Sequence, residues 1–159
     1  MIYYRNEVRK SGVDGRALRA TAKRLLAAAG EAGSSLSLTL VGDDAMRELN
    51  RDHRGKDVPT DVLSFPLLSF ETLAALAPQD DREDEPERMI GDVVISVDTA
   101  RKQAADYDAP LQRELERLLI HGILHVLGHD HMEVGEREKM EAEERRLASA
   151  IGMPWPYLT

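Results

Sequence analysis

One segment, residues 110–128, is apolar on nearly every side of the helix that its spacing predicts. Pro110 suits the first turn of a helix, and Gly128 suits the position just past its end. A helix that is apolar all round has to be buried, so the rest of the chain must pack around it. Its apolar positions are Leu111, Leu115, Leu118, Leu119, Ile123, Leu124, Val126 and Leu127.

Shorter patterns predict the elements that surround this helix. Strands are expected over residues 2–4, 36–41, 62–65 and 89–97. Further helices are expected over residues 15–29, 43–51, 98–106 and 136–151. We expect Asp43, Asp44 and Asp98 to cap two of these helices. Together they indicate a single α+β layered domain over residues 1–159, in which helices cover a mixed sheet of about four strands and the buried helix is central.

The composition excludes several classes of protein. The chain has 159 residues and no cysteine, so disulfides and thiolate metal sites are impossible. Its few aromatic residues predict an aliphatic core. No apolar run approaches membrane-spanning length, and the N-terminus has no secretory pattern. We therefore expect a cytoplasmic protein with no membrane partner.

The net charge of −8 is unevenly distributed. The first 24 residues contain seven basic and two acidic side chains, which permits a basic face on an acidic protein. The composition of residues 71–88 predicts a long acidic loop, with one possible helical turn at 72–77. Loops of this length are usually mobile. The carboxylates between Glu133 and Glu144 are expected to form a solvated helix face without chemistry.

Three histidines near the C-terminal end predict a metal site. His121 and His125 are one turn apart on the buried helix, about 6 Å along its axis, so their rings can meet at one cation. Gly128 ends the helix and lets His131 return as a third ligand. Three neutral nitrogens leave a fourth tetrahedral position open, as in catalytic zinc sites. Zinc is the expected metal, with nickel, iron and copper as alternatives. If no metal binds, each buried histidine needs a hydrogen-bond partner of its own.

The residue between the histidines argues against a peptidase. From His125 the spacing H-x-x-G-x-x-H equals that of the metzincin proteases, which carry a glutamate general base directly after their first histidine. This chain has Gly122 at that position, and glycine cannot accept a proton. Hydrolysis of another bond remains open, because zinc alone lowers the pKa of bound water to about 7.

A second polar segment lies between the predicted helix 43–51 and the strand 62–65. Arg47, Arg51, Arg54 and Lys56 fall within ten positions there, and Gly55 lets the backbone bend. A turn that presents arginine suits phosphate binding, because guanidinium pairs with phosphate in a bidentate fork. A charged connection with Asp57 and Asp61 capping its turns accounts for the composition equally well.

With both segments in view, the chain resembles the YbeY family of bacterial endoribonucleases. The resemblance rests on E-L-N-R-D-H-R-G-K-D-V-P-T-D-V-L-S-F-P at 48–66, G-D-V-V-I-S at 91–96 and H-G-I-L-H-V-L-G-H-D-H at 121–131, with M-E-A-E-E and I-G-M-P-W-P-Y near the end. It implies a metal-dependent, single-strand-specific ribonuclease for small-subunit ribosomal RNA maturation and ribosome quality control. It also implies zinc at His121, His125 and His131, a catalytic Arg54, and ribosomal RNA, the ribosome or small-subunit assembly proteins as partners.

Two positions depart from the family pattern, since His53 and His129 stand where tyrosine is usual. We interpret both as packing or hydrogen-bonding substitutes. In the expected mechanism the metal polarises a phosphodiester oxygen and supplies hydroxide while Arg54 stabilises the phosphoryl charge, or else the ribose 2′-OH attacks. The alternatives are a non-catalytic ribosome-assembly factor with a structural metal, and a divergent metallopeptidase.

Overall fold

Four strands form one mixed sheet in the computed structural model, which describes residues 1–67, 88–129 and 132–155. Within this part of the chain the strands are β1 (Ile2–Asn6), β2 (Ser34–Val41), β3 (Val62–Pro66) and β4 (Arg88–Ser96). Their order across the sheet is β1-β2-β4-β3. β1, β2 and β4 run parallel, and β3 is antiparallel at one edge. The predicted mixed four-stranded sheet is confirmed.

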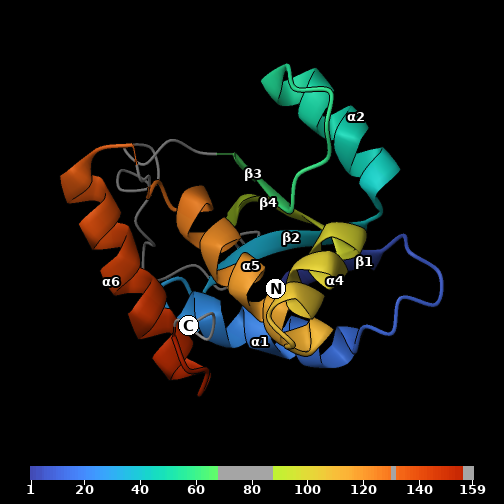
Figure 1. Cartoon of the computed structure of the whole chain (residues 1–159). Helices are drawn as coiled ribbons and strands as arrows, with labels where there is room; N and C mark the ends of the chain where they lie inside the picture. Colours follow the sequence, from blue (N-terminus) through green and yellow to red (C-terminus); the bar gives the residue numbers. More distant parts are fainter. Residues whose placement is uncertain (68–87, 130–131, 156–159) are drawn as a thin grey trace.

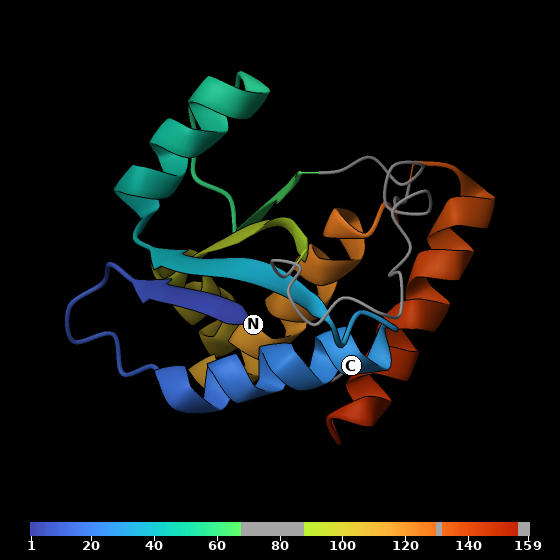
Figure 2. The same ribbon diagram turned by 180° about the vertical axis from the view of Figure 1, so that it is seen from behind.

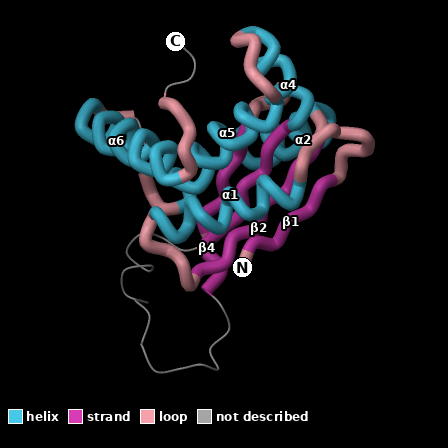
Figure 3. Tube along the Cα trace, turned by 90° about the horizontal axis from the view of Figure 1, so that it is seen from below, coloured by secondary structure: helices cyan, strands magenta, loops and turns pink. Residues whose placement is uncertain are grey.

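Helices cover one face of the sheet almost completely and the other face at one end. The described helices are α1 (Gly15–Ala28), α2 (Asp43–Arg54), α4 (Val97–Asp106), α5 (Leu111–Val126) and α6 (Val134–Ala150). Of these described helices, α1, α4, α5 and α6 lie on one side of the sheet, and α2 lies on the other (Figures 1 and 2). Figure 3 shows α1 and α5 crossing the strands. This is the layered α+β arrangement that the patterns predict.

The core has two parts, one on each face of the sheet. Leu36, Leu38 and Leu40 alternate along β2 and pack into the large cluster beneath α1, α4, α5 and α6. A smaller cluster under α2 contains Val41 and Met46, with Leu63 and Val94 from the neighbouring strands. The largest fully buried side chains are leucine, isoleucine and methionine, so the predicted aliphatic core is confirmed.

The buried helix is central, as its sequence predicts. Helix α5 contacts β3 and β4 on one side and α1, α4 and α6 on the others. Its buried side chains occur in every turn, which removes the helix from water on most of its circumference. Such a helix gives the histidines near its C-terminal end a rigid base.

Two helix starts differ from the prediction. Gly42 precedes α2, so Asp43 and Asp44 lie in its first turn rather than at the N-cap. Helix α4 begins at Val97, directly after β4, and the hydroxyl of Ser96 caps it by accepting the Thr99 N–H. Asp98 instead accepts the backbone N–H of Asp43. The aspartates therefore join two helix starts to each other, which sequence spacing alone does not reveal.

The expected acidic loop 71–88 lies outside the described residues, except for Arg88, which begins β4. The possible helical turn at 72–77 lies outside them as well. Among the helices that the structure describes, none has the length and apolar character needed to cross a bilayer.

Candidate active site

His121 and His125 face each other near the C-terminal end of α5. Their Nε2 atoms are 3.1 Å apart, and the ring centroids are 4.6 Å apart with the planes at 75°. The prediction that both rings share one helix face is confirmed. Two nitrogens that bind one tetrahedral zinc at about 2.0–2.1 Å lie roughly 3.4 Å apart. The separation suits a shared cation, and it also suits an N–H···N hydrogen bond when one Nε2 carries a proton.

Helix α5 ends in a glycine-dependent turn, as predicted. Gly128 adopts a left-handed backbone, with φ of 95°. Its N–H donates to the His125 carbonyl, and the His129 N–H donates to the Leu124 carbonyl, at 3.0 and 2.9 Å. These two bonds define a Schellman motif, which reverses the chain direction after the helix.

The third predicted ligand, His131, lies outside the described residues, as does Asp130. Among residues 1–67, 88–129 and 132–155, no three side chains of the metal-binding types converge. The described part of the site thus supplies two imidazoles.

His129 is half-buried and lies near Glu143 on α6. The pKa of Glu143 is lowered mainly by hydrogen bonds from Arg146 and further by His129.

Gly122 is required by packing against the sheet. A Cβ atom at Gly122 would lie 2.7 Å from Cγ1 of Val93 on β4 and 3.3 Å from Cγ2 of Val62 on β3. The Ser64 hydroxyl also donates to the Gly122 carbonyl at 3.0 Å. The position that carries glutamate in metzincins is therefore filled by the sheet itself, and no base can project from it.

A carboxylate that the sequence pattern assigned to solvent lies beside the histidines. Oε1 of Glu144, on α6, is 3.5 Å from Nδ1 of His121, and the glutamate side chain is only 13 % exposed. The expectation that all carboxylates between residues 133 and 144 form a solvated face is thus wrong at Glu144. A signal was present, because Glu144 falls between Met140 and Leu147 at helical spacing, and both of these are buried.

Arg54 is the last residue of α2 and not part of the turn that follows. The helix runs three residues further than predicted, and Gly55 ends it in a left-handed conformation with φ of 70°. Arg54 is exposed. Arginine has a high helix propensity, and residues 51–54 contain neither glycine nor proline, so α2 continues until Gly55 ends it.

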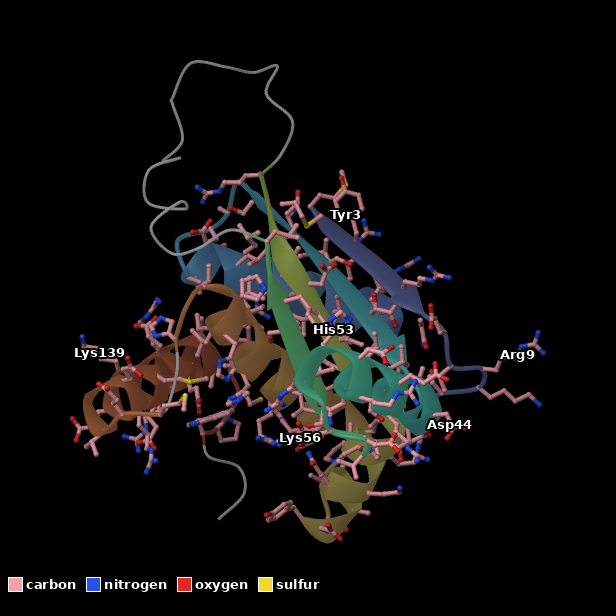
Figure 4. The ribbon with its side chains drawn as sticks, turned by 90° about the horizontal axis from the view of Figure 1, so that it is seen from above. Tyr3, Arg9, Asp44, His53, Lys56 and Lys139 are labelled. Atoms are coloured by element: carbon pink, nitrogen blue, oxygen red, sulfur yellow. The ribbon has the colours of Figure 1, made fainter. Side chains whose placement is uncertain are left out.

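The end of α2 and helix α5 each contact β3. The His53 ring makes an edge-on contact with Phe65, at 4.9 Å between centroids. Residue Ser64, next to Phe65, bonds to Gly122 between the two histidines of α5. Asn50, which is buried, donates from Nδ2 to the Val58 carbonyl at 2.7 Å and fixes the connection after the helix. Figure 4 shows His53 and Lys56 at this end of α2.

The three basic residues predicted to contact RNA have different surroundings. Arg47 makes a two-bond pair with Asp57, at 2.9 and 3.0 Å. These bonds raise the pKa of Arg47 and lower the pKa of Asp57. Arg51 pairs with Asp52 at 3.3 Å, and Lys56 is exposed. Two of the three cations thus already face a carboxylate on the surface.

Comparison with known proteins identifies relatives along most of the chain. The family model described as "Endoribonuclease YbeY" matches residues 3–152. "Endoribonuclease YbeY" of Desulfitobacterium hafniense (strain Y51) is 47 % identical over 126 residues, covering 76 % of this chain and 73 % of the relative. The protein of the same name from Moorella thermoacetica is 42 % identical over 146 residues, 87 % and 90 % of the two chains. A solution structure of TM1509 from Thermotoga maritima shares the fold, with a TM-score of 0.58, 24 % identity and coverage of 94 % and 90 %.

Proposed function

Because the chain belongs to the YbeY endoribonuclease family, we propose that it is a metal-dependent, single-strand-specific endoribonuclease that matures small-subunit ribosomal RNA and acts in ribosome quality control. The observation that carries the proposal is the 3.1 Å approach of Nε2 of His121 to Nε2 of His125. Its partners would be ribosomal RNA and the ribosome or small-subunit assembly proteins, in the cytoplasm where ribosomes assemble.

The proposed metal is zinc, bound by His121 and His125 and by His131 as third ligand. Imidazole nitrogens suit zinc, and the chain has no thiolate to compete for it. When bound, zinc would polarise a phosphodiester oxygen and lower the pKa of a water molecule. The His121 side chain is 30 % exposed, which favours an open catalytic site over a closed structural one.

Arg54 is proposed as the catalytic cation. It ends α2 beside β3, and β3 packs on α5 through the bond from Ser64 to Gly122. A guanidinium group donates two parallel hydrogen bonds to phosphoryl oxygens and keeps its charge at any physiological pH. It would therefore stabilise negative charge that develops on the phosphoryl group, whichever oxygen attacks.

Arg47, Arg51 and Lys56 are proposed to hold the RNA strand through its phosphates. Phosphate contacts position a strand without reading its sequence, and binding through them weakens as salt increases. The pairs of Arg47 with Asp57 and of Arg51 with Asp52 are exposed, so a phosphate can replace the carboxylate at little cost.

A cleavage assay with a fluorogenic single-stranded RNA tests the proposal. Zinc-loaded protein should cut this RNA, should leave a matched duplex intact and should lose activity when a chelator removes the metal. Arg54→Ala should lower kcat by about 100-fold or more, the size seen when one oxyanion-stabilising donor is removed. Arg19→Ala is the control, because Arg19 is an exposed arginine on α1, and it should cut at the wild-type rate.

Each failure has its own meaning. Cleavage by Arg54→Ala at the wild-type rate would remove Arg54 from the mechanism. A folded, zinc-loaded protein that cuts no RNA would indicate a non-catalytic assembly factor, whereas cleavage of a peptide substrate would indicate the peptidase. Products that end in a 2′,3′-cyclic phosphate would exclude direct attack by water and assign the nucleophile to the ribose 2′-OH.

A further inference from the structure

We propose that Glu144 is a positioning residue for the metal site: its carboxylate accepts the Nδ1–H of His121 and so holds the imidazole with Nε2 towards the cation. The proposal rests on the metal site put forward above. Its basis is the 3.5 Å separation between Glu144 Oε1 and His121 Nδ1, which joins α6 to the ligand helix α5.

The two nitrogens of the His121 ring face different partners. Nε2 faces Nε2 of His125 at 3.1 Å, and Nδ1 faces the carboxylate of Glu144. A neutral imidazole that binds a metal through Nε2 must carry its proton on Nδ1. The ring is thus already oriented with its donor nitrogen towards an acceptor and its ligand nitrogen towards the second histidine.

The packing of α6 places Glu144 beside His121. Its side chain is 13 % exposed, and it lies on the same side of the helix as the buried Met140 and Leu147. Removing a carboxylate from water is costly unless hydrogen bonds offset the loss. Arg146, two positions further along α6, binds Glu143 and the Ala28 carbonyl.

Metal binding would complete the contact. A separation of 3.5 Å is about 0.6 Å longer than an ordinary N–H···O hydrogen bond, a gap that a small rotation of the glutamate side chain can close. A carboxylate on the far nitrogen of a ligand histidine fixes the tautomer and makes the ligand nitrogen more basic. Glu144 is not itself a ligand, because it faces the ring nitrogen opposite to the one that meets His125.

Zinc affinity of the purified full chain, measured by competition with a chromophoric chelator, tests the proposal. Glu144→Gln keeps the size of the side chain but replaces the anionic acceptor, and it should weaken zinc binding about 10- to 100-fold. Glu141→Gln, on an exposed position one turn earlier in α6, is the matched control and should change the affinity less than twofold. The metal-free unfolding free energies of the two variants should agree, which separates a metal-directed role from a structural one.

A spectroscopic measurement adds a test whose first arm needs only the wild-type protein. In zinc-loaded wild-type protein, proton–nitrogen correlation spectra should show His121 protonated at Nδ1, and this proton should exchange slowly with water. In zinc-loaded Glu144→Gln the same proton should exchange faster. An unprotonated Nδ1, or a zinc affinity of Glu144→Gln within twofold of wild type, would overturn the role of Glu144 and leave the metal site intact. Wild-type protein that binds no zinc would overturn both proposals.

Discussion

Gly122 lies against Val93 so closely that a Cβ atom would be 2.7 Å from the valine Cγ1 atom. Val93 is fully buried in the middle of β4, and α5 crosses the sheet at this point. The missing side chain brings the backbone of the histidine-bearing helix onto the strand. Glycine at position 122 therefore has two effects. It allows α5 to pack closely on β4, and it leaves no general base at the position where metzincin motifs carry glutamate.

Gly122→Ala is predicted to destabilise the protein by about 1–3 kcal/mol. Overpacking a well-filled core costs this much, and the higher helix propensity of alanine recovers only part of it. Urea unfolding followed by circular dichroism measures the change. A Cβ atom at Gly135, in the first turn of α6, would meet no atom of the described residues within 4 Å, so Gly135→Ala should be neutral or stabilising. Equal stability of Gly122→Ala and wild type would contradict the close contact.

The second prediction concerns Asp43, whose carboxylate joins α2 to α4. It accepts hydrogen bonds from Ser96 Oγ and Thr99 Oγ1 at 2.7 and 2.6 Å and pairs with Lys102. Burial raises the pKa of Asp43, but these hydrogen bonds and the ammonium group outweigh burial and lower the pKa overall. A lowered folded-state pKa stabilises the protein above the unfolded value of about 3.9, and the stabilisation disappears as the pH falls through the folded value.

Asp43→Asn should therefore reduce the unfolding free energy by about 1 kcal/mol at pH 7. The difference from wild type should stay constant down to about pH 5 and shrink below pH 4, because there the unfolded carboxyl takes up a proton before the folded one, whose pKa is lower. Asp44→Asn is the control, since Asp44 occupies the next position in the same turn and is exposed. A deficit that persists unchanged to pH 3 would show that the charge of Asp43 is not what stabilises the fold.

The third prediction concerns the exposed pair of Arg47 and Asp57. Asp57→Asn should tighten binding of single-stranded RNA a few-fold, because the guanidinium no longer has to exchange a carboxylate for a phosphate. Fluorescence anisotropy at several salt concentrations measures the affinity. Glu48→Gln makes the same change of net charge on the exposed side of α2 and should tighten binding less. Equal effects of the two variants would mean that only total charge matters and that Arg47 makes no phosphate contact.

Local sequence signals predicted the parts of the fold that depend on neighbours in the chain. The apolar pattern of α5, the shared face of His121 and His125 and the turn at Gly128 follow from residues a few positions apart. The predicted end of α2 at Arg51 is three residues early, because nothing at Arg51 stops a helix, whereas Gly55 does. Helix propensity changes only gradually from residue to residue, so the predicted helix end is wrong by three residues.

Contacts between distant segments were beyond such signals. The order β1-β2-β4-β3, the bond from Ser64 to Gly122 and the approach of Glu144 to His121 all depend on how helices and strands pack. The spacing of Glu144 from Met140 and Leu147 indicates its inward face, but its contact with His121 depends on how α6 packs against α5. The role of His131 stays a prediction, because that residue lies outside the described part of the chain.

The last prediction concerns the turn that leads from α5 towards His131. Gly128 has a φ of 95°, a conformation in which a side chain is strained. Gly128→Ala should cost about 1–2 kcal/mol of stability, the penalty of a left-handed conformation for an ordinary residue. Gly128→Asn should lose less, because asparagine tolerates this region better than alanine does. If the turn positions the third ligand, the zinc affinity should follow the same order. It should be highest for wild type, lower for Gly128→Asn and lowest for Gly128→Ala. Unfolding and zinc competition measured on the same samples check both rankings, and unchanged zinc affinity in the alanine variant would separate the turn from the metal site.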